Sequence, residues 1–246
     1  MAFAMPFGKD KRGQARQVKS MRMEQFRIPG SIGEARAIQE EIRREVGEEP
    51  GVPSTNPSLV AGADASYGSA SAYASVVLMK FPSLAFCSRA EARSGIQYPY
   101  VPGYFSFREI PPLLEAFSLL GRFPDLVMVH GHGYAHPRRT GLATHLGYHL
   151  QIPSIGIAGS GMKGMDAREP SLLQGSATPV WMDGEMVGTL LRTREGSAAV
   201  YVSAGYRTTL DQAREIVMQC IRANRFPEPL VQADRATRRM RNRCER

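Results

Sequence analysis

The sequence predicts a single α/β domain built on a mixed sheet with helices on both faces. Three apolar or alternating runs separated by short turns predict an antiparallel meander. These runs lie at residues 59–64, 73–81 and 84–91. A strand at 125–129, a helix at 140–150 and a strand at 154–158 then form a β-α-β unit, whose two strands are parallel. A meander joined to a β-α-β unit fits one mixed sheet.

Helices are expected on either side of these strands. Ser31 and Glu34 form a capping-box pattern, apolar residues then recur every three or four positions, and Gly47 is placed to end the helix. The same periodicity predicts helices within 105–120 and 210–223. Short strands are expected at 178–182, 186–191 and 199–203.

Composition excludes several classes of protein. With 246 residues and 43% hydrophobic residues, the chain suits a globular domain and not a disordered one. It has no apolar run long enough to span a membrane and no readable signal peptide, so a cytoplasmic location is expected. Three widely spaced cysteines without a C-x-x-C pattern argue against disulfides and thiolate zinc sites.

The net charge of +8 is concentrated at the two ends of the chain. Residues 1–22 and 235–246 each carry six Lys or Arg against one acidic residue, whereas the residues between them are nearly neutral. We therefore predict a basic, disordered arm at 1–22, a domain at 23–234 and a basic C-terminal tail at 235–246. Such arms attract polyanions, although solubilising tails without a partner are the alternative.

Three acidic residues are candidates for chemistry. Asp64 directly follows a run that should be buried, Glu109 lies among apolar residues near a helix start, and Asp234 follows the last expected helix. Taken singly, they could equally be a turn aspartate, a helix N-terminal charge and a surface acid.

All five histidines lie between positions 130 and 149. His145 and His149 have the i, i+4 spacing that could place two zinc ligands on one helix face. Partly buried, hydrogen-bonded histidines are the preferred interpretation, because no third ligand is near in the sequence.

Taken together, six motifs resemble the endonuclease V family. They are VAGADASY at 60–67, PYVPGYFSFREIP at 99–111, VHGHGYAHPRRTGLATHLG at 129–147, PSIGIA at 153–158, YVSAGYR at 201–207 and RFPEP at 225–229. They occur in the family's order, and the resemblance spans about residues 31–240.

The resemblance implies a ribonuclease-H-like fold and metal-dependent hydrolysis of a phosphodiester near a deaminated purine, hypoxanthine or inosine, in DNA or RNA. Asp64 and Glu109 match the family's metal ligands, and Asp234 matches its late ligand. Mg²⁺ or Mn²⁺ is the expected cofactor, because hard cations take several anionic oxygens.

Three positions depart from the family pattern. His130 stands where the family has an aspartate, so we expect it to be a substituted ligand or a general base. Gly159 stands where the family has a lysine, and Tyr206 replaces a histidine. Losing a carboxylate should weaken Mg²⁺ binding, and imidazole suits Mn²⁺ or another softer ion. Weakened or altered catalysis is therefore expected.

The family's nucleic-acid interface is better preserved. Tyr100 and its neighbours match a wedge that enters the base stack, and glycine-containing loops match a pocket that reads the flipped base with backbone amides. The expected contacts are Pro99, Tyr100, Val101, Pro102, Gly103, His136, Arg138, Arg139, Gly159, Ser160, Gly161 and Met162.

Three functional hypotheses follow. The first is an endonuclease with weakened or altered activity, the second a nuclease-dead homologue that binds damaged or modified nucleic acid, and the third an enzyme acting on another base lesion. No membrane is expected to take part, and no protein partner is readable. The choice between DNA and RNA, the lesion and the oligomeric state stay open.

Overall fold

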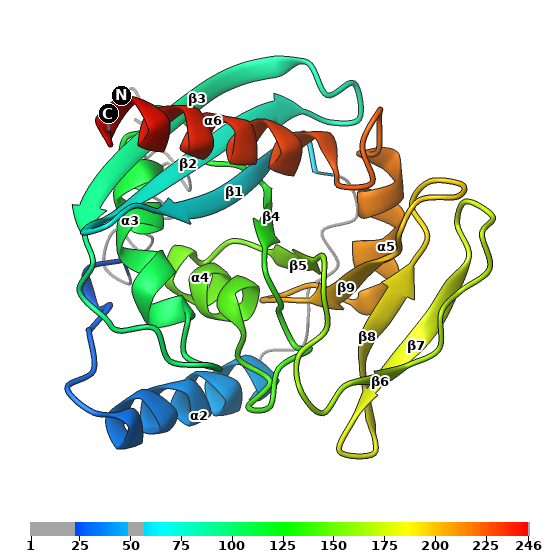
Figure 1. Cartoon of the computed structure of the whole chain (residues 1–246), viewed down its shortest axis with the longest axis horizontal. Coiled ribbons are helices and arrows are strands. Elements are labelled where there is room, and N and C mark those ends of the chain that lie inside the picture. The colour runs from blue at the N-terminus through cyan, green and yellow to red at the C-terminus, as the bar shows by residue number, and fades with distance from the viewer. Residues whose placement is uncertain (1–22, 49–56, 246) are drawn as a thin grey trace, which may run out of the picture.

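The computed structural model describes residues 23–48 and 57–245, and in these residues nine strands form one sheet (Figure 1). The strand order is β3-β2-β1-β4-β5-β9-β8-β7-β6. The strands are β1 (Leu59–Tyr67), β2 (Ser71–Lys80), β3 (Phe86–Gly95), β4 (Leu126–His130), β5 (Ser154–Ala158), β6 (Asp166–Ala167), β7 (Ala177–Met182), β8 (Glu185–Leu191) and β9 (Val200–Ala204). The helices are α2 (Ile32–Glu48), α3 (Ser106–Ser118), α4 (Leu142–Leu150), α5 (Leu210–Gln219) and α6 (Glu228–Cys244).

The expected mixed topology is confirmed. β1, β2 and β3 form an antiparallel meander, while β1 pairs with β4 and β4 with β5 in parallel. From β5 onward the sheet is antiparallel again, through β9, β8 and β7 to β6. The parallel pairs form the centre of the sheet, where the carboxyl ends of β1 and β4 lie side by side.

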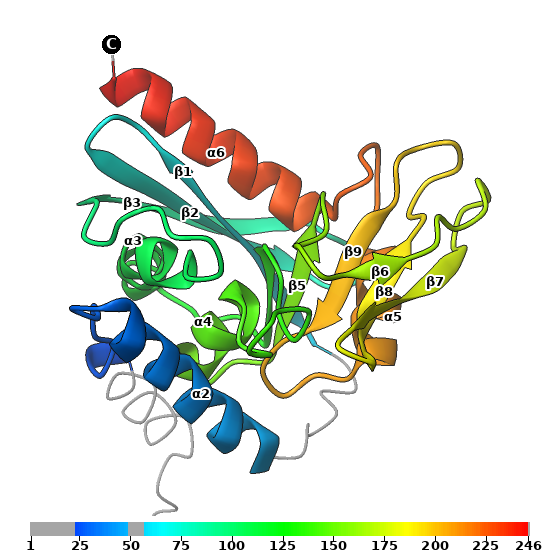
Figure 2. The ribbon, with the colours of Figure 1, turned by 60° about the horizontal axis from the view of Figure 1, so that its bottom comes forward.

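Two hydrophobic cores cover the two faces of this sheet. One packs residues of α3 and α4, such as Phe117 and Leu146, against β1 and β4. The other packs residues of α5 and α6, such as Val217 and Leu230, against the opposite face. Figure 2 shows α6 lying across β1 and β2 on one side, with α2, α3 and α4 on the other.

Gly62 explains how closely α6 approaches the sheet. A Cβ atom at this position would lie 2.1 Å from the backbone carbonyl atoms of Pro229 in the first turn of α6. The glycine therefore allows backbone to pack on backbone, as close contacts between elements often require. Asp64 lies two residues further along β1, on the same face, because side chains alternate along a strand.

The segment predicted as a basic C-terminal tail is helical over most of its length. Residues 235–244 are helical, because α6 begins at Glu228 and continues to Cys244 with Ala233, Ala236 and Thr237 buried against the sheet. The predicted arm at 1–22 lies outside the described residues. The division into arm, domain and tail stays a prediction.

Local features of the helices also bear on the sequence analysis. At the start of α2 the Ser31 hydroxyl accepts the backbone N–H of Glu34, and the Glu34 carboxylate accepts that of Gly30. The helix continues one residue past Gly47. Among the described residues, no helix is long and apolar enough to cross a membrane.

Candidate active site and nucleic-acid interface

Three of the predicted ligands converge beside the sheet. Asp64, His130 and Asp234 each place a ligand atom within 4.8 Å of the others, and they form the one such group of three or more among the described residues. They come from β1, the end of β4 and α6. Two carboxylates and an imidazole can hold a divalent cation that accepts oxygen and nitrogen ligands.

Hydrogen bonds fix Asp64 within this group. Its Oδ1 lies 2.8 Å from Nδ1 of His130, and its Oδ2 accepts the Thr237 hydroxyl at 2.8 Å. Asp64 is 6% exposed, whereas the His130 side chain is 37% exposed. Lone pairs of Asp64 and the second ring nitrogen of His130 stay available to a ligand.

The sheet register brings these residues together. Ala63 of β1 is in register with Val129 of β4, so Asp64 and His130 follow as the next adjacent positions. The close approach of α6 at Gly62 then places Asp234 and Thr237, one turn apart on the helix, next to Asp64.

The surroundings of the site shift the pKa values of two of its titratable groups, His130 and Glu109. The hydrogen bond to Asp64, opposed by burial, raises the pKa of His130. Glu109 lies outside the group of three, and burial raises the pKa of its carboxyl group to about 7, with the Asp64 charge acting in the same direction. The role of Glu109 as a metal ligand stays a prediction, since its carboxylate is not placed with the other three.

A cavity of about 660 Å³ adjoins the metal-ligand group. Its walls include Glu109 and His130, together with most of the predicted nucleic-acid contacts. These contacts are Pro102, Gly103, His136, Arg138, Gly159, Ser160, Gly161 and Met162. The structure thus brings two predicted regions, 102–103 and 159–162, to one cavity beside the ligand group, and its volume lies in the range of small-molecule sites.

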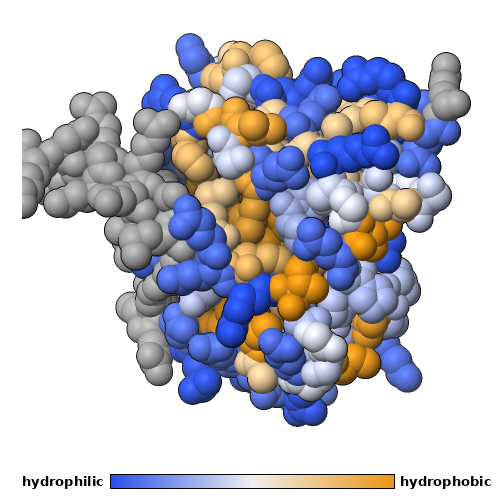
Figure 3. All heavy atoms as spheres, turned by 90° about the vertical axis from the view of Figure 1, so that its left-hand side faces the viewer, coloured by the Kyte–Doolittle hydropathy of each residue, from blue (hydrophilic) through white to orange (hydrophobic). Residues whose placement is uncertain are grey.

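The predicted wedge projects from the connection between β3 and α3. The Tyr100 side chain is 69% exposed and packs edge-to-face on Phe105, with ring centroids 4.6 Å apart. Pro99 is exposed as well, whereas Val101 is partly buried against a cluster that includes Phe107. The connection runs along the left of Figure 1, and on that side apolar side chains gather in a band between hydrophilic ones (Figure 3).

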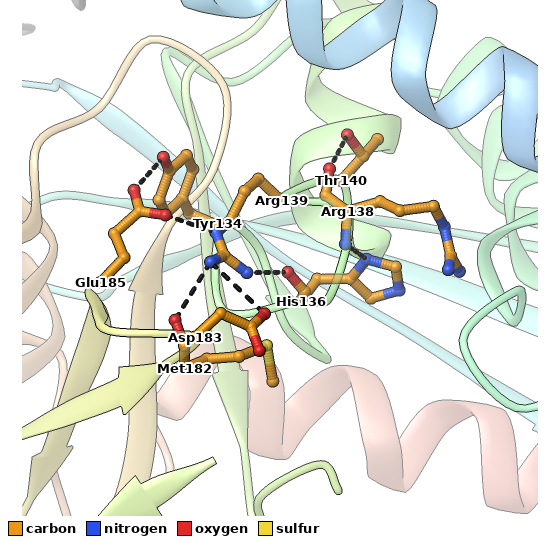
Figure 4. A network of polar contacts seen from close by, with 8 residues as sticks. All are labelled: Tyr134, His136, Arg138, Arg139, Thr140, Met182, Asp183 and Glu185. Atoms are coloured by element: carbon orange, nitrogen blue, oxygen red, sulfur yellow. Dashed lines mark hydrogen bonds and ion pairs between the residues drawn. The ribbon is translucent and has the colours of Figure 1, made fainter. Parts of the chain in front are cut away.

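Arg139 is a structural arginine. It is 5% exposed, its Nε donates to Glu185 at 2.8 Å, and its other nitrogens donate to the carbonyl oxygens of His136 and Met182 (Figure 4). The ion pair ties its loop to the β7–β8 hairpin and supports a left-handed backbone with φ of +55°. Its predicted contact with nucleic acid stays a prediction.

Arg138 and His136 brace the wedge. Arg138 donates through Nη2 to the carbonyl oxygen of Gly103 at 2.6 Å and through Nε to Gln39 at 2.5 Å. His136 lies with Nε2 3.0 Å from the same Gly103 oxygen, and its Nδ1 faces the backbone N–H of Arg138 at 3.2 Å. These contacts require a neutral imidazole with its proton on Nε2, and burial lowers the pKa of His136 to about 3.

The three substituted positions lie in different places. His130 is in the ligand group and Gly159 is at the cavity wall, where a Cβ would lie 3.2 Å from Nη2 of Arg225. Tyr206 is fully buried, and its hydroxyl donates to Gln151 at 3.0 Å. It does not line the cavity.

Sequence reasoning missed three residues of this region. Gln39 donates to the carbonyl oxygens of Gly103 and Thr140 from α2, Thr237 holds Asp64, and His132 lies with Nε2 3.0 Å from the Ser160 oxygen. Of these three residues, only His132 was indicated by the sequence, because it belongs to the cluster of five histidines. His145 and His149 are buried, with His145 bonded to Ser106 at 2.9 Å, and they belong to no group of three ligands in the described part of the chain.

A mixed sheet with carboxylates that converge from β1 and a C-terminal helix is the arrangement expected of a nuclease with a divalent-metal site. The family model for endonuclease V matches residues 40–235. Endonuclease V of Roseiflexus castenholzii is 47% identical over 207 residues, which cover 84% of this chain and 91% of that protein. Endonuclease V of Methanopyrus kandleri is 40% identical over 208 residues, with 85% and 88% covered.

Solved structures agree with the sequence comparisons. Endonuclease V from Streptomyces avermitilis has a TM-score of 0.82 and 36% identity, covering 89% of this chain and 96% of its own. The catalytic domain of human endonuclease V has a TM-score of 0.76 and 27% identity, with 85% and 96% covered. The chain belongs to the endonuclease V family and is a hydrolytic endonuclease with a candidate divalent-metal site.

Proposed function

We propose that the chain hydrolyses a phosphodiester bond in nucleic acid near a deaminated purine, hypoxanthine or inosine, with a divalent cation held by Asp64, His130 and Asp234. The observation that carries this proposal is the convergence of three ligand atoms within 4.8 Å beside a cavity with room for a base. A homologue from Ciona intestinalis has been solved with DNA containing an inosine, which agrees with this substrate class.

The donor set favours Mn²⁺ or another softer ion over Mg²⁺. His130 contributes a nitrogen, which Mn²⁺ accepts more readily than Mg²⁺ does. It also replaces a unit of negative charge, which is worth several kcal/mol beside a dication at an effective dielectric near 20. When bound, the ion supplies charge stabilisation at the reacting phosphate.

The chain's own residues position the substrate. The exposed Tyr100 is available to enter a base stack, and Gly103 and Gly159–Met162, which line the cavity, could offer backbone groups to a flipped base. Asp64 holds His130 through Nδ1, which leaves Nε2 of His130 for a metal ion or a proton. We propose that His130 acts there as a ligand or as a general base.

A second candidate is a homologue that binds damaged nucleic acid without cleaving it. His130 favours this candidate for two reasons: its hydrogen bond engages one oxygen of Asp64, and it stands where the resemblance to the family implies a further carboxylate. An enzyme for a different base lesion is the third candidate, since the Gly159 segment shapes the cavity wall. A cytoplasmic location stays a prediction.

One experiment separates the first two candidates. Labelled strands with and without hypoxanthine are incubated with the protein in Mg²⁺, Mn²⁺ or Co²⁺, beside the Asp64→Ala and His130→Asp variants. Nicking near hypoxanthine that Asp64→Ala abolishes supports the nuclease. The binding protein is identified instead if no metal supports nicking, damage-dependent binding is retained, and His130→Asp restores nicking.

A further inference from the structure

Arg238 forms an exposed ion pair with one of the metal ligands. Its Nε lies 2.7 Å from Oδ1 of Asp234, one helical turn earlier on α6. The Arg238 side chain is 64% exposed and that of Asp234 is 29% exposed. The same carboxylate therefore faces a guanidinium on its solvent side and the ligand group with Asp64 and His130 on the other.

This contact uses only part of the guanidinium. Nε is the Arg238 nitrogen bonded to Asp234, and within the described residues its two terminal nitrogens have no hydrogen-bond or ion-pair partner. A guanidinium presents its donors as a planar fork, which matches the oxygens of a phosphate group. The free edge of Arg238 thus offers a phosphate site next to the metal-ligand group.

Metal and arginine compete for Asp234. A dication beside Asp234 withdraws negative charge from the ion pair and repels the guanidinium. An exposed i, i+4 pair is weak, since it changes an equilibrium constant only about twofold. Releasing Arg238 therefore costs little.

We propose that Arg238 exchanges partners when the metal binds, leaving Asp234 and contacting a phosphate of the nucleic acid beside the scissile bond. The proposal rests on the proposed function, because it places the substrate strand beside the middle of α6. Arg238 then has two opposite effects. It weakens metal binding in the free protein, and it strengthens nucleic-acid binding in the metal-loaded protein.

The test measures both effects on the full chain without using cleavage as the readout. Mn²⁺ affinity is measured by electron paramagnetic resonance of free Mn²⁺ in the absence of nucleic acid. Binding of a hypoxanthine-containing oligonucleotide with phosphorothioate linkages is then followed by fluorescence anisotropy in Mn²⁺ across a range of salt concentrations. The variants are Arg238→Gln, Arg238→Lys and Arg239→Gln.

Arg239 is the matched control. It is the next residue on the same exposed stretch of α6 and carries the same charge, but it points about 100° away around the helix and has no ion pair with Asp234. Both arginines are exposed, so their substitution leaves the core intact. A thermal unfolding curve for each variant verifies this.

We expect Arg238→Gln to bind Mn²⁺ about two- to threefold more tightly. Its slope of log affinity against log salt should fall by about one, the loss of a single phosphate contact. Arg238→Lys should keep the slope, and Arg239→Gln should leave Mn²⁺ affinity unchanged. An unchanged Mn²⁺ affinity in Arg238→Gln, an unchanged slope, or an equal gain in Mn²⁺ affinity in Arg239→Gln overturns the proposal.

Failure of this proposal is distinguishable from failure of the proposed function. If no metal supports nicking, Mn²⁺ affinity and oligonucleotide binding still report on Arg238. If nicking is normal but the Arg238→Gln results match those of Arg239→Gln, only the partner exchange is wrong.

Discussion

The candidate metal-ligand group and the rim of the cavity differ in how their side chains are held. By the rim we mean the residues that brace the cavity wall, which are Gln39, His136, Arg138 and Arg139. In the ligand group, Asp64 is held by two side chains, His130 is partly exposed and Asp234 pairs with a solvent-exposed arginine. At the rim, hydrogen bonds of Gln39, Arg138 and the buried Arg139 join four separate segments.

This difference indicates that the geometry of the rim is fixed by hydrogen bonds, whereas that of the ligand group is less constrained. The rim is organised before any ligand arrives, as a site that recognises a base by shape requires. The ligand group is more exposed and carries His130 where the resemblance to the family implies an aspartate, so we expect a divalent cation to complete it. The two regions should therefore respond differently to substitution, to pH and to metal.

Removing the central ligand tests the catalytic side of this contrast. Asp64→Asn should lower nicking at least about a thousandfold, because a neutral amide loses the charge that holds the cation. Its affinity for a hypoxanthine-containing strand in EDTA should stay within about twofold of the parent's. Nicking assays and anisotropy measure the two quantities.

Asp125→Asn is the control for this substitution. Asp125 lies at the opposite end of the same parallel pair and accepts the backbone N–H groups of Ser58 and Leu59, which an asparagine oxygen can also do. This variant should nick normally. Normal nicking by Asp64→Asn would contradict the assignment of the ligand group.

Removing the central arginine tests the rim. Arg139→Met should lower the free energy of unfolding by about 3 kcal/mol, because two carbonyl oxygens and Glu185 lose a buried charged donor. Urea unfolding measures the loss. Arg139→Lys should lie between the parent and Arg139→Met, and an unchanged urea midpoint in Arg139→Met would show that the hairpin is held by other contacts.

The central sheet could be predicted from the sequence because its signals are local. The strand at 154–158 has the predicted bounds, and the parallel pairing of β4 with β5 follows from the β-α-β unit. Asp64 stands out locally only as an acid at the end of an apolar run, which could equally be a turn aspartate. The resemblance to endonuclease V makes it a candidate ligand, and that role stays a prediction.

Helix α6 and the braces of the rim could not be predicted in this way. The buried face of α6 consists of small residues such as Ala233, Ala236 and Thr237, because the helix packs closely over Gly62, so its apolar signal is weak next to its arginines. The Gln39 contacts span 64 and 101 positions, and nothing local marks them. Long-range hydrogen bonds of this kind depend on the finished fold.

Low pH should lower the free energy of unfolding through protonation of His136 at the rim. Its folded pKa of about 3 lies below the unfolded value near 6.5, so its contribution to stability is complete above pH 6.5 and is lost progressively as the pH falls towards 3. Between pH 7.5 and pH 5 this one group should cost about 2 kcal/mol. Urea unfolding of the parent at the two pH values measures the total loss.

His136→Gln isolates that contribution. Glutamine can donate to the Gly103 oxygen and accept the Arg138 N–H without titrating. The variant should therefore lose about 2 kcal/mol less than the parent between the two pH values. Equal losses in both proteins would mean that His136 does not stay neutral in the folded chain.

Substitution of the wedge residue Tyr100 should give the smallest effect. It tests directly whether nucleic-acid binding at the rim is independent of metal binding at the ligand group. Tyr100→Ala should weaken binding of a hypoxanthine-containing strand about tenfold, within the range for losing one base–aromatic stack, because the exposed ring would no longer enter the stack. Mn²⁺ affinity should not change, since Tyr100 makes no contact with the ligand group. Tyr100→Phe keeps the ring and should bind like the parent. A change in Mn²⁺ affinity in Tyr100→Ala would show that the loop and the metal ligands are coupled, and the separation between a preformed rim and an incomplete metal group would then fail.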